Sequence, residues 1–214
     1  SNVDHRQPAG PGRVDHRRQP VNGLRSEYHV DIRGAAANGV PFLARHAAAH
    51  ADDEVIGCGA MMAWHRSQGH AVTVVHVTDG AAGDPEGRYS DVAALRRGEG
   101  RAALEALDVR DLRTLDLPDG SLPEHFDAVV GGVRGLIEEI APQTLYTFFY
   151  TESHRDHRAV AAAVAESADA IPSDCRCLLF GVNQVVVGGS MFDVSDWEEH
   201  KERALACYTS QLAY

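Results

Sequence analysis

Short apolar runs alternate with longer stretches of helical periodicity from residue 40 onward. This alternation is typical of βαβ units, in which helices cover both faces of a parallel sheet. The sequence therefore predicts an α/β fold with a mostly parallel sheet between two helical layers. The predicted strands span 40–49, 71–77, 112–117, 144–149 and 177–187, and the predicted helices lie near 54–68, 91–107, 124–140, 157–170 and 196–210.

Boundary residues support three of these helices. Gly69 is a suitable stop for the first helix, and Ser90 or Asp91 can cap the second. Pro142 ends the third, because proline cannot continue a helix.

The first 33 residues lack such a period. The sequence VDHRQP at residues 3–8 nearly recurs as VDHRRQP at residues 14–20, with proline and glycine between the two copies. Six arginines against four acidic residues make this segment basic, whereas the remainder of the chain is acidic. This composition is typical of a tail. We therefore predict a tail-like segment at 1–33 and a single domain at 34–214, and leave open whether the tail contacts a partner.

Overall composition narrows the class of protein. The 214 residues are 44% hydrophobic and 24% charged, which indicates a soluble globular protein, and the formal net charge of −11 gives no general attraction for nucleic acid or anionic membranes. No apolar run approaches the roughly 18 to 20 residues of a membrane span, and no signal peptide is evident. The four cysteines form no C-x-x-C pair and are expected to be reduced. The expected compartment is the cytoplasm.

Two predicted loops are rich in residues that bind metals. In open parallel sheets, ligands bind beyond the carboxyl ends of the strands, here at 50–54, 78–90, 118–122 and 150–157. The first of these loops reads HADDE, and the last contains ESHRDH at residues 152–157. Each lies where a strand is expected to end and a helix to begin.

His50, Asp53 and His157 are the candidate metal ligands. The three-residue offset between His50 and Asp53 can turn both side chains toward one point, and His157 can supply a third ligand from the other loop. Two imidazoles and one carboxylate suit zinc with an open fourth position, the catalytic pattern. Such an ion would bring the pKa of bound water from 15.7 to about 7, which a carboxylate alone cannot do.

The remaining polar residues of the two loops have roles beside that ion. Asp52 is free to accept the proton of the attacking water, and His154 can stabilise the oxyanion or protonate the leaving group. Asp156 would orient a histidine. The competing interpretation is that the acidic residues merely cap a helix and that the histidines lie on the surface. Two such loops, each after a predicted strand, favour the metal site.

With these motifs the chain resembles the PIG-L/LmbE-like zinc N-deacetylases, whose hallmarks are His-Pro-Asp-Asp-Glu and, much later, His-Pro-Asp-His. They stand here as HADDE at 50–54 and HRDH at 154–157, and family-like stretches extend the resemblance over about residues 40–211. The resemblance implies a Rossmann-like fold, zinc held by His50, Asp53 and His157, Asp52 as general base and His154 at the oxyanion. It also places Arg96 among the substrate-facing residues.

Both motif prolines are replaced, by Ala51 and Arg155. Because proline stiffens a loop, we expect looser loops with the ligand geometry retained. Arg155 brings a charge to the mouth of the site and can pair with an acid such as Glu152.

The predicted function is removal of an N-acetyl or other N-acyl group from a glucosamine-type conjugate or a related small molecule, by a zinc-activated water with Asp52 as base. Zinc is the predicted metal, and another divalent metal such as Fe²⁺ is the alternative. The alternative is a relative that binds metal or sugar with little or no hydrolase activity. A dinucleotide-binding protein is disfavoured because the third glycine of its fingerprint is missing, and a serine hydrolase because the chain has no G-x-S-x-G elbow. The oligomeric state stays open.

Overall fold

The computed structural model describes residues 29–30, 43–184, 186, 189 and 191–212 of the chain. They fall into two units, of which the larger comprises Val40–Val187 and Val194–Tyr214 and the smaller Ser1–Gly39 and Gly188–Asp193. In the smaller unit, β1 (His29–Val30) pairs in parallel with β7 (Met191–Phe192). The rest of the predicted tail at 1–33 lies outside the described residues, so that assignment stays a prediction.

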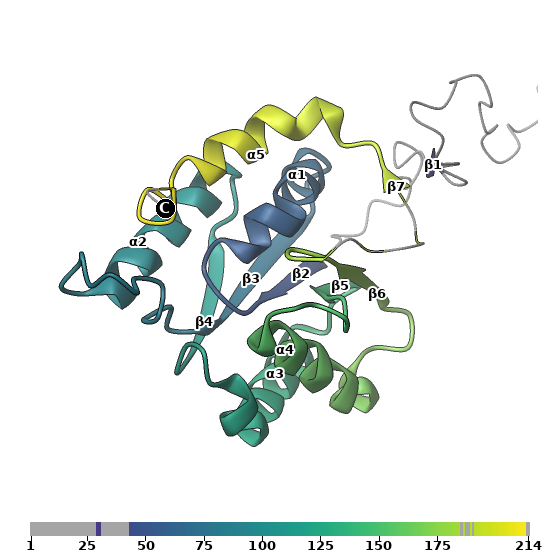
Figure 1. The fold of residues 1–214 in the computed structure, drawn as a ribbon. Helices are drawn as coiled ribbons and strands as arrows, with labels where there is room; N and C mark the ends of the chain where they lie inside the picture. The colour runs from purple at the N-terminus through teal and green to yellow at the C-terminus, as the bar shows by residue number, and fades with distance from the viewer. Residues whose placement is uncertain (1–28, 31–42, 185, 187–188, 190, 213–214) are drawn as a thin grey trace, which may run out of the picture. The chain divides into compact units, whose positions relative to one another are not determined.

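A parallel five-stranded sheet forms the centre of the larger unit, with the strand order β4-β3-β2-β5-β6 (Figure 1). Helices α1, α2 and α5 lie on one face of this sheet, and α3 and α4 lie on the other (Figure 1). The predicted three-layer α/β fold is therefore confirmed. The strands are β2 (Leu43–Ala48), β3 (Ala71–Thr78), β4 (Asp111–Leu117), β5 (Thr144–Phe148) and β6 (Arg176–Phe180).

The central strands carry the apolar core. In β3 every residue after Ala71 is buried, and all of β5 is buried, because helices cover both faces there. The edge strand β4 is only partly buried, which fits its alternation of apolar with charged residues. The buried side chains of α1, α3 and α4, such as Met62, Val133 and Val160, pack onto this sheet in one continuous core.

The helices begin and end close to the predicted positions. They are α1 (Asp53–Ser67), α2 (Val92–Ala106), α3 (Phe126–Ile140), α4 (Arg155–Glu166) and α5 (Glu198–Leu205), with short 3₁₀ turns at η2 (Leu122–His125), η3 (Ala168–Ala170) and η4 (Ser195–Trp197). Gly69 follows α1 in the left-handed region with φ 76°, and the Asp91 carboxylate caps α2 by accepting from the Ala94 amide. None of these described helices is long and apolar enough to cross a membrane.

Two predicted elements are shorter than expected. The strand predicted at 177–187 ends at Phe180, because the amides of Val182 and Asn183 turn away to bind the Glu152 carboxylate; residues 185 and 187 lie outside the described part. The helix predicted at 196–210 ends at Leu205, and the Ser210 amide beyond it donates to Glu99. In both places a buried carboxylate takes backbone donors that a regular element would have used.

The other differences are smaller. The helix predicted at 157–170 begins at Arg155 and ends at Glu166, where the Ser167 hydroxyl donates to the Ala163 carbonyl and a 3₁₀ turn follows. The described part of the first strand begins at Leu43, and the predicted residues 40–42 lie outside it.

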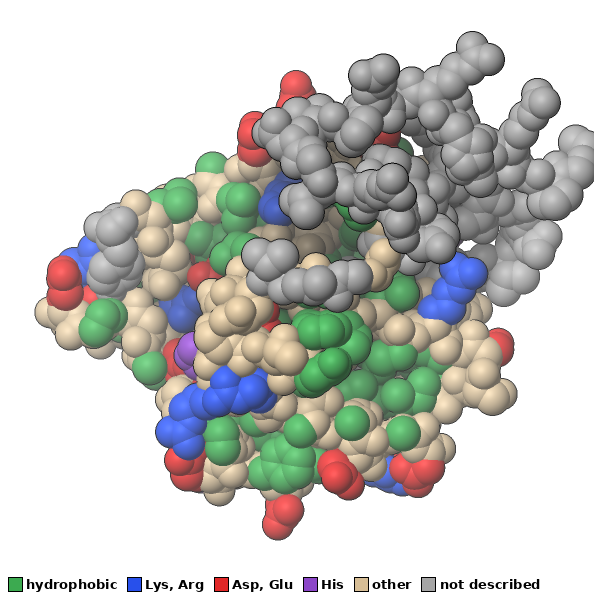
Figure 2. Space-filling model, turned by 45° about the vertical axis from the view of Figure 1, so that its right-hand side comes forward, with side chains coloured by type: hydrophobic (Ala, Val, Ile, Leu, Met, Phe, Trp, Pro, Cys, Tyr) green, Lys and Arg blue, Asp and Glu red, His purple; other side chains and the backbone are tan. Residues whose placement is uncertain are grey.

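On the face shown in Figure 2, acidic and basic side chains are interspersed, with hydrophobic side chains gathered between them.

Candidate functional site

The two ligand-rich loops meet at the carboxyl edge of the sheet, where β2 and β5 are neighbours. His50 follows β2 directly, and Asp53 is the first residue of α1. His154 is the N-cap of α4, and His157 lies in its first turn. Neighbouring parallel strands thus bring together residues that lie about a hundred positions apart in the sequence.

Asp53 lies between the two imidazoles that the sequence pairs with it. Its Oδ2 atom is 3.1 Å from Nδ1 of His50 and 3.2 Å from Nε2 of His157. Asp53 is 4% exposed and His157 is 1% exposed, so this contact is shielded from water. Burial alone would raise the pKa of Asp53, but His157 and His50 hold it well below its usual range. The carboxylate is therefore charged and available to a cation.

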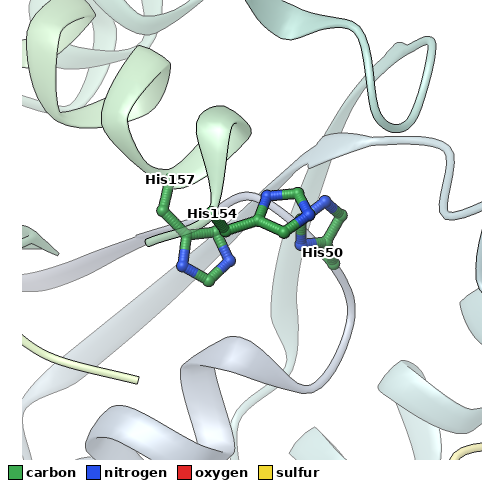
Figure 3. A group of neighbouring side chains, drawn as sticks. All are labelled: His50, His154 and His157. Carbon is green, nitrogen blue, oxygen red and sulfur yellow. The ribbon is translucent and has the colours of Figure 1, made fainter. Parts of the chain in front are cut away.

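A third imidazole faces the same point. The ring centroid of His154 lies 4.7 Å from that of His50 and 4.9 Å from that of His157. Figure 3 shows the three rings gathered in one place, with His154 and His157 from the start of α4 and His50 from the loop after β2. One nitrogen of each ring lies within 4.8 Å of the others, which is close enough for the three to share an ion.

The outer nitrogens of His50 and His157 lie beside carboxylates. Nε2 of His50 lies 3.0 Å from Oδ1 of Asp119 and 3.4 Å from Oδ2 of Asp156. Nδ1 of His157 lies 3.0 Å from Oε2 of Glu152. Histidines that bind metals commonly donate their second N–H to a carboxylate in this way, which fixes the tautomer and the ring orientation. The residues present therefore fit a divalent cation.

Charge around His50 is strongly negative. Burial lowers its pKa, but the carboxylates of Asp119, Asp156 and Asp53 together raise it well above the usual value. The Asp156 carboxylate is itself held by the amides of Gly120 and Leu122, at 2.8 and 3.0 Å. This pocket stabilises positive charge on or beside the imidazole.

Asp52 occupies a strained turn between β2 and α1. Its φ of 130° lies where only glycine is comfortable, so the surrounding contacts must hold it there. Its amide donates to Oε2 of Glu54 at 3.1 Å, and its Oδ2 is 3.2 Å from Nη2 of Arg96. Arg96 also donates to the Ala51 carbonyl. Burial, followed by the charge of Asp53, raises the pKa of Asp52 to about 7, against the opposing charge of Arg96.

Glu54 connects this turn to two more distant elements. It is fully buried, with Oε2 3.2 Å from Nε2 of His76 on β3 and with Oε1 accepting from the Tyr208 hydroxyl. His76 and Tyr208 thereby hold Glu54, and Glu54 holds the Asp52 amide. The motif acid at position 54 is part of the scaffold of the turn.

His154 keeps a free N–H for the site. The Asp156 amide donates to Nδ1 of His154 at 3.2 Å, which leaves the ring proton on Nε2. Burial first, and then the positive charges of His50 and His157, lower the pKa of His154. Of the two roles that the sequence suggests for His154, a ring that donates through Nε2 favours stabilisation of the oxyanion.

Two arginines lie differently from the sequence expectation. Arg96 was predicted to face the substrate, but its side chain is only 5% exposed and lies against Asp52, so its contact with substrate stays a prediction. Arg155 pairs with Glu124 on η2. The suggested pairing of Arg155 with Glu152 is wrong, because Glu152 points inward to His157.

Asp119 is the site residue that sequence reasoning underestimated. No role at the site was predicted for it from the sequence, yet its carboxylate binds His50 and lies 4.0 Å from Nη1 of Arg96. Its place directly after the third predicted strand was the available signal, since loop 118–122 lies at the same sheet edge as the ligand loops.

The fold and the site define an α/β protein with a cluster of histidines and carboxylates at the carboxyl edge of its sheet, where a metal ion could bind. The chain belongs to the PIG-L family, described as GlcNAc-PI de-N-acetylase, whose sequence profile matches residues 47–168. The resemblance seen in the sequence is thereby confirmed.

Several similar proteins are deacetylases. The chain is 29% identical over 176 residues to a probable N-acetyl-alpha-D-glucosaminyl L-malate deacetylase 2 of Bacillus cereus, covering 76% of this chain and 80% of that protein. Its fold matches an N,N'-diacetylchitobiose deacetylase from Pyrococcus horikoshii with a TM-score of 0.69 and 23% identity, over 80% of this chain and 70% of that one. It also matches the zinc-inhibited form of a teicoplanin deacetylase with a TM-score of 0.66 and 19% identity, over 80% and 85% of the two chains.

Proposed function

We propose that this protein is a metal-dependent amide hydrolase that removes the N-acetyl group of a glucosamine-type conjugate. The observation that carries the proposal is the Asp53 carboxylate between the imidazoles of His50 and His157, next to Asp52, whose carboxylate pairs with Arg96. Family membership supports the deacetylase class. The deacetylases among the similar proteins act on an N-acetyl-alpha-D-glucosaminyl L-malate, on N,N'-diacetylchitobiose and on teicoplanin, which supports an N-acetylated amino sugar as the substrate.

His50, Asp53 and His157 would hold the metal. A set of two imidazoles and one carboxylate suits Zn²⁺, and Fe²⁺ is the alternative for the same ligands. When bound, the ion supplies Lewis acidity that lowers the pKa of water at an open coordination position. The cytoplasmic location expected from the sequence stays a prediction.

Asp52 is the general base of the proposed reaction. As the water oxygen bonds to the acetyl carbon, a carboxylate oxygen of Asp52 accepts the water proton. When the C–N bond breaks, Asp52 can return this proton to the departing nitrogen, which gives acetate and a free amine. Arg96 holds the Asp52 carboxylate in place during both transfers.

His154 stabilises the oxygen of the acetyl group. Its Nε2–H points into the site because the Asp156 amide occupies Nδ1. A hydrogen bond donated to the developing oxyanion strengthens as negative charge forms there, which lowers the barrier selectively. Asp156 serves both histidines, since its carboxylate faces His50 and its amide binds His154.

Acetate release tests the proposal. The metal-free protein, and the same protein with Zn²⁺ or Fe²⁺ added from below one equivalent to excess, would be incubated with a panel of N-acetylglucosaminyl conjugates. We expect acetate and free amine in equal amounts, only with metal. Because one structural relative was solved in a zinc-inhibited form, the titration should extend past saturation. Tight zinc binding without cleavage of any conjugate would favour the metal- or sugar-binding alternative.

A further inference from the structure

Glu152 is a buried acid that the proposed reaction does not use. It lies in the turn between β5 and α4 and is 1% exposed. Its Oε2 atom faces Nδ1 of His157 at 3.0 Å. A buried carboxylate is costly unless its oxygens are paired, so this position requires specific partners.

The other partners of Glu152 are backbone amides of the loop after β6. Oε1 accepts from the amides of Val182 and Asn183 at 2.8 and 3.2 Å, and Oε2 accepts from the Asn183 amide at 3.1 Å. A side chain at Gly181 would meet the Gln184 carbonyl, since a Cβ built there lies 2.4 Å from that oxygen. Glycine therefore allows the loop to fold tightly over the carboxylate.

The ring of His157 is fixed on three sides. Phe148 stacks on its face with centroids 4.0 Å apart and the planes 12° from parallel. Asp53 lies at Nε2, and Glu152 lies at Nδ1. Stacking on Phe148 sets the plane of the imidazole. It does not distinguish between the two ring orientations that differ by a half-turn about the Cβ–Cγ bond. A carboxylate at Nδ1 selects the tautomer in which Nε2 keeps a free lone pair for a cation.

We infer that Glu152 is a positioning residue for the metal site, which holds His157 as the Nδ1–H tautomer and ties this ligand to the loop at 181–184. The inference rests on His157 being a metal ligand, as proposed above. Loss of such a partner typically weakens metal binding by about 10- to 100-fold. Metal affinity can therefore test the role of Glu152 without any substrate.

Zinc affinity of the full-length Glu152→Gln protein tests the inference, measured by competition with a chromophoric chelator at one fixed pH. Glutamine has nearly the same shape but lacks the charge, so we expect the zinc dissociation constant to rise by about 10- to 100-fold. Glu124→Gln is the matched control, because it removes the same charge at an exposed acid that pairs with Arg155 and not with a ligand. Its affinity should stay within about twofold of the wild-type value.

A purely structural role gives a different result. If Glu152 only anchors the loop, the metal-free Glu152→Gln protein melts earlier while its zinc affinity equals that of the control, and the inference is overturned. Long-range ¹H–¹⁵N spectra of the metal-free protein give a second readout. The Nδ1–H signal of His157 should be present in the wild type and in Glu124→Gln and be lost or shifted in Glu152→Gln.

Glu152→Asp covers the case in which Glu152→Gln does not fold. Aspartate keeps the carboxylate at a shorter reach, so the zinc affinity and the Nδ1–H signal of His157 should fall together; a wild-type affinity with the Nδ1–H signal lost would contradict the positioning role. A wild-type protein that binds no zinc would overturn the metal site and this inference together. Zinc binding that is equal in the wild type and in Glu152→Gln would overturn the inference alone.

Discussion

The two ends of α1 carry two histidine groups with opposite surroundings. At its first residue, Asp53 joins His50 and His157, and carboxylates bind the outer nitrogens of both rings. In its last turn, Nε2 of His65 lies 2.9 Å from the Tyr146 hydroxyl and Nδ1 lies 2.9 Å from Nδ1 of His70. Trp64 packs edge-on against His65.

The pKa values of the two groups move in opposite directions. Carboxylates raise the pKa of His50 well above its usual value although burial opposes them. Burial, followed by the charge of His70, lowers the pKa of His65 to about 3. Acids that converge on a buried histidine thus favour its charged form, whereas burial beside a second histidine favours the neutral form.

His157→Ala should have the largest effect, because it removes a ligand from the acidic group. We expect loss of stoichiometric zinc and, with it, of metal-dependent acetate release. Metal content after equilibrium dialysis is the measurement. His70→Ala is the control from the other group and should keep full zinc content. Full zinc stoichiometry in His157→Ala would contradict the ligand assignment.

Asp52→Asn should separate chemistry from metal binding. The amide cannot accept the water proton, so we expect hydrolysis to fall by about 10²- to 10⁴-fold. Zinc content should be unchanged, since Asp52 faces Arg96 and is not placed between the imidazoles. Rates and zinc content measured on the same preparation check this. A variant that loses zinc along with activity would make Asp52 a ligand.

His154→Ala sharpens the role of the third imidazole. Removal of one oxyanion donor typically costs about 10²- to 10³-fold in rate, and we expect a loss of this size with zinc retained. The kcat value and the zinc dissociation constant distinguish the alternatives. Weakened zinc binding would instead show that all three clustered histidines hold the ion.

The lowered pKa of His65 predicts that the stability of the protein depends on pH. Because the folded-state pKa of His65 lies below the unfolded value, the folded state binds fewer protons, and stability falls as pH drops from about 6.5 toward 3. Between pH 7 and pH 5, His65 should lower the free energy of unfolding by about 2 kcal/mol.

His65→Gln should remove this contribution, as urea unfolding of the wild type and the variant at the two pH values would show. Exposed His125→Gln is the control and should leave the pH dependence unchanged. A stability difference between wild type and His65→Gln that does not vary with pH would mean that His65 is not buried as the neutral form.

The sequence predicted the parallel α/β sheet and the ligand types at its edge for a physical reason. Hydrophobic periodicity is a local property, and strands that alternate with helices must run parallel. HADDE and HRDH each follow a strand, so the topology alone brings His50, Asp53 and His157 to one edge. Shortening of the last strand and helix was not predictable, because Glu152 and Glu99 draw in backbone amides from segments far away in the chain.

Only the tertiary structure decided how the site is supported. Asp119 and Arg96 stand in no motif with the atoms they touch, and their contacts depend on how separate segments pack. Glu152 shares a loop with His157, but its other partners, the amides of Val182 and Asn183, come from far along the chain. Tertiary structure also decides which ring nitrogen of His50 and of His157 faces the centre of the site, because Asp119 and Glu152 bind the other nitrogen of each ring. Local pattern determines which residues arrive at the sheet edge, whereas long-range packing determines which of their atoms face one another.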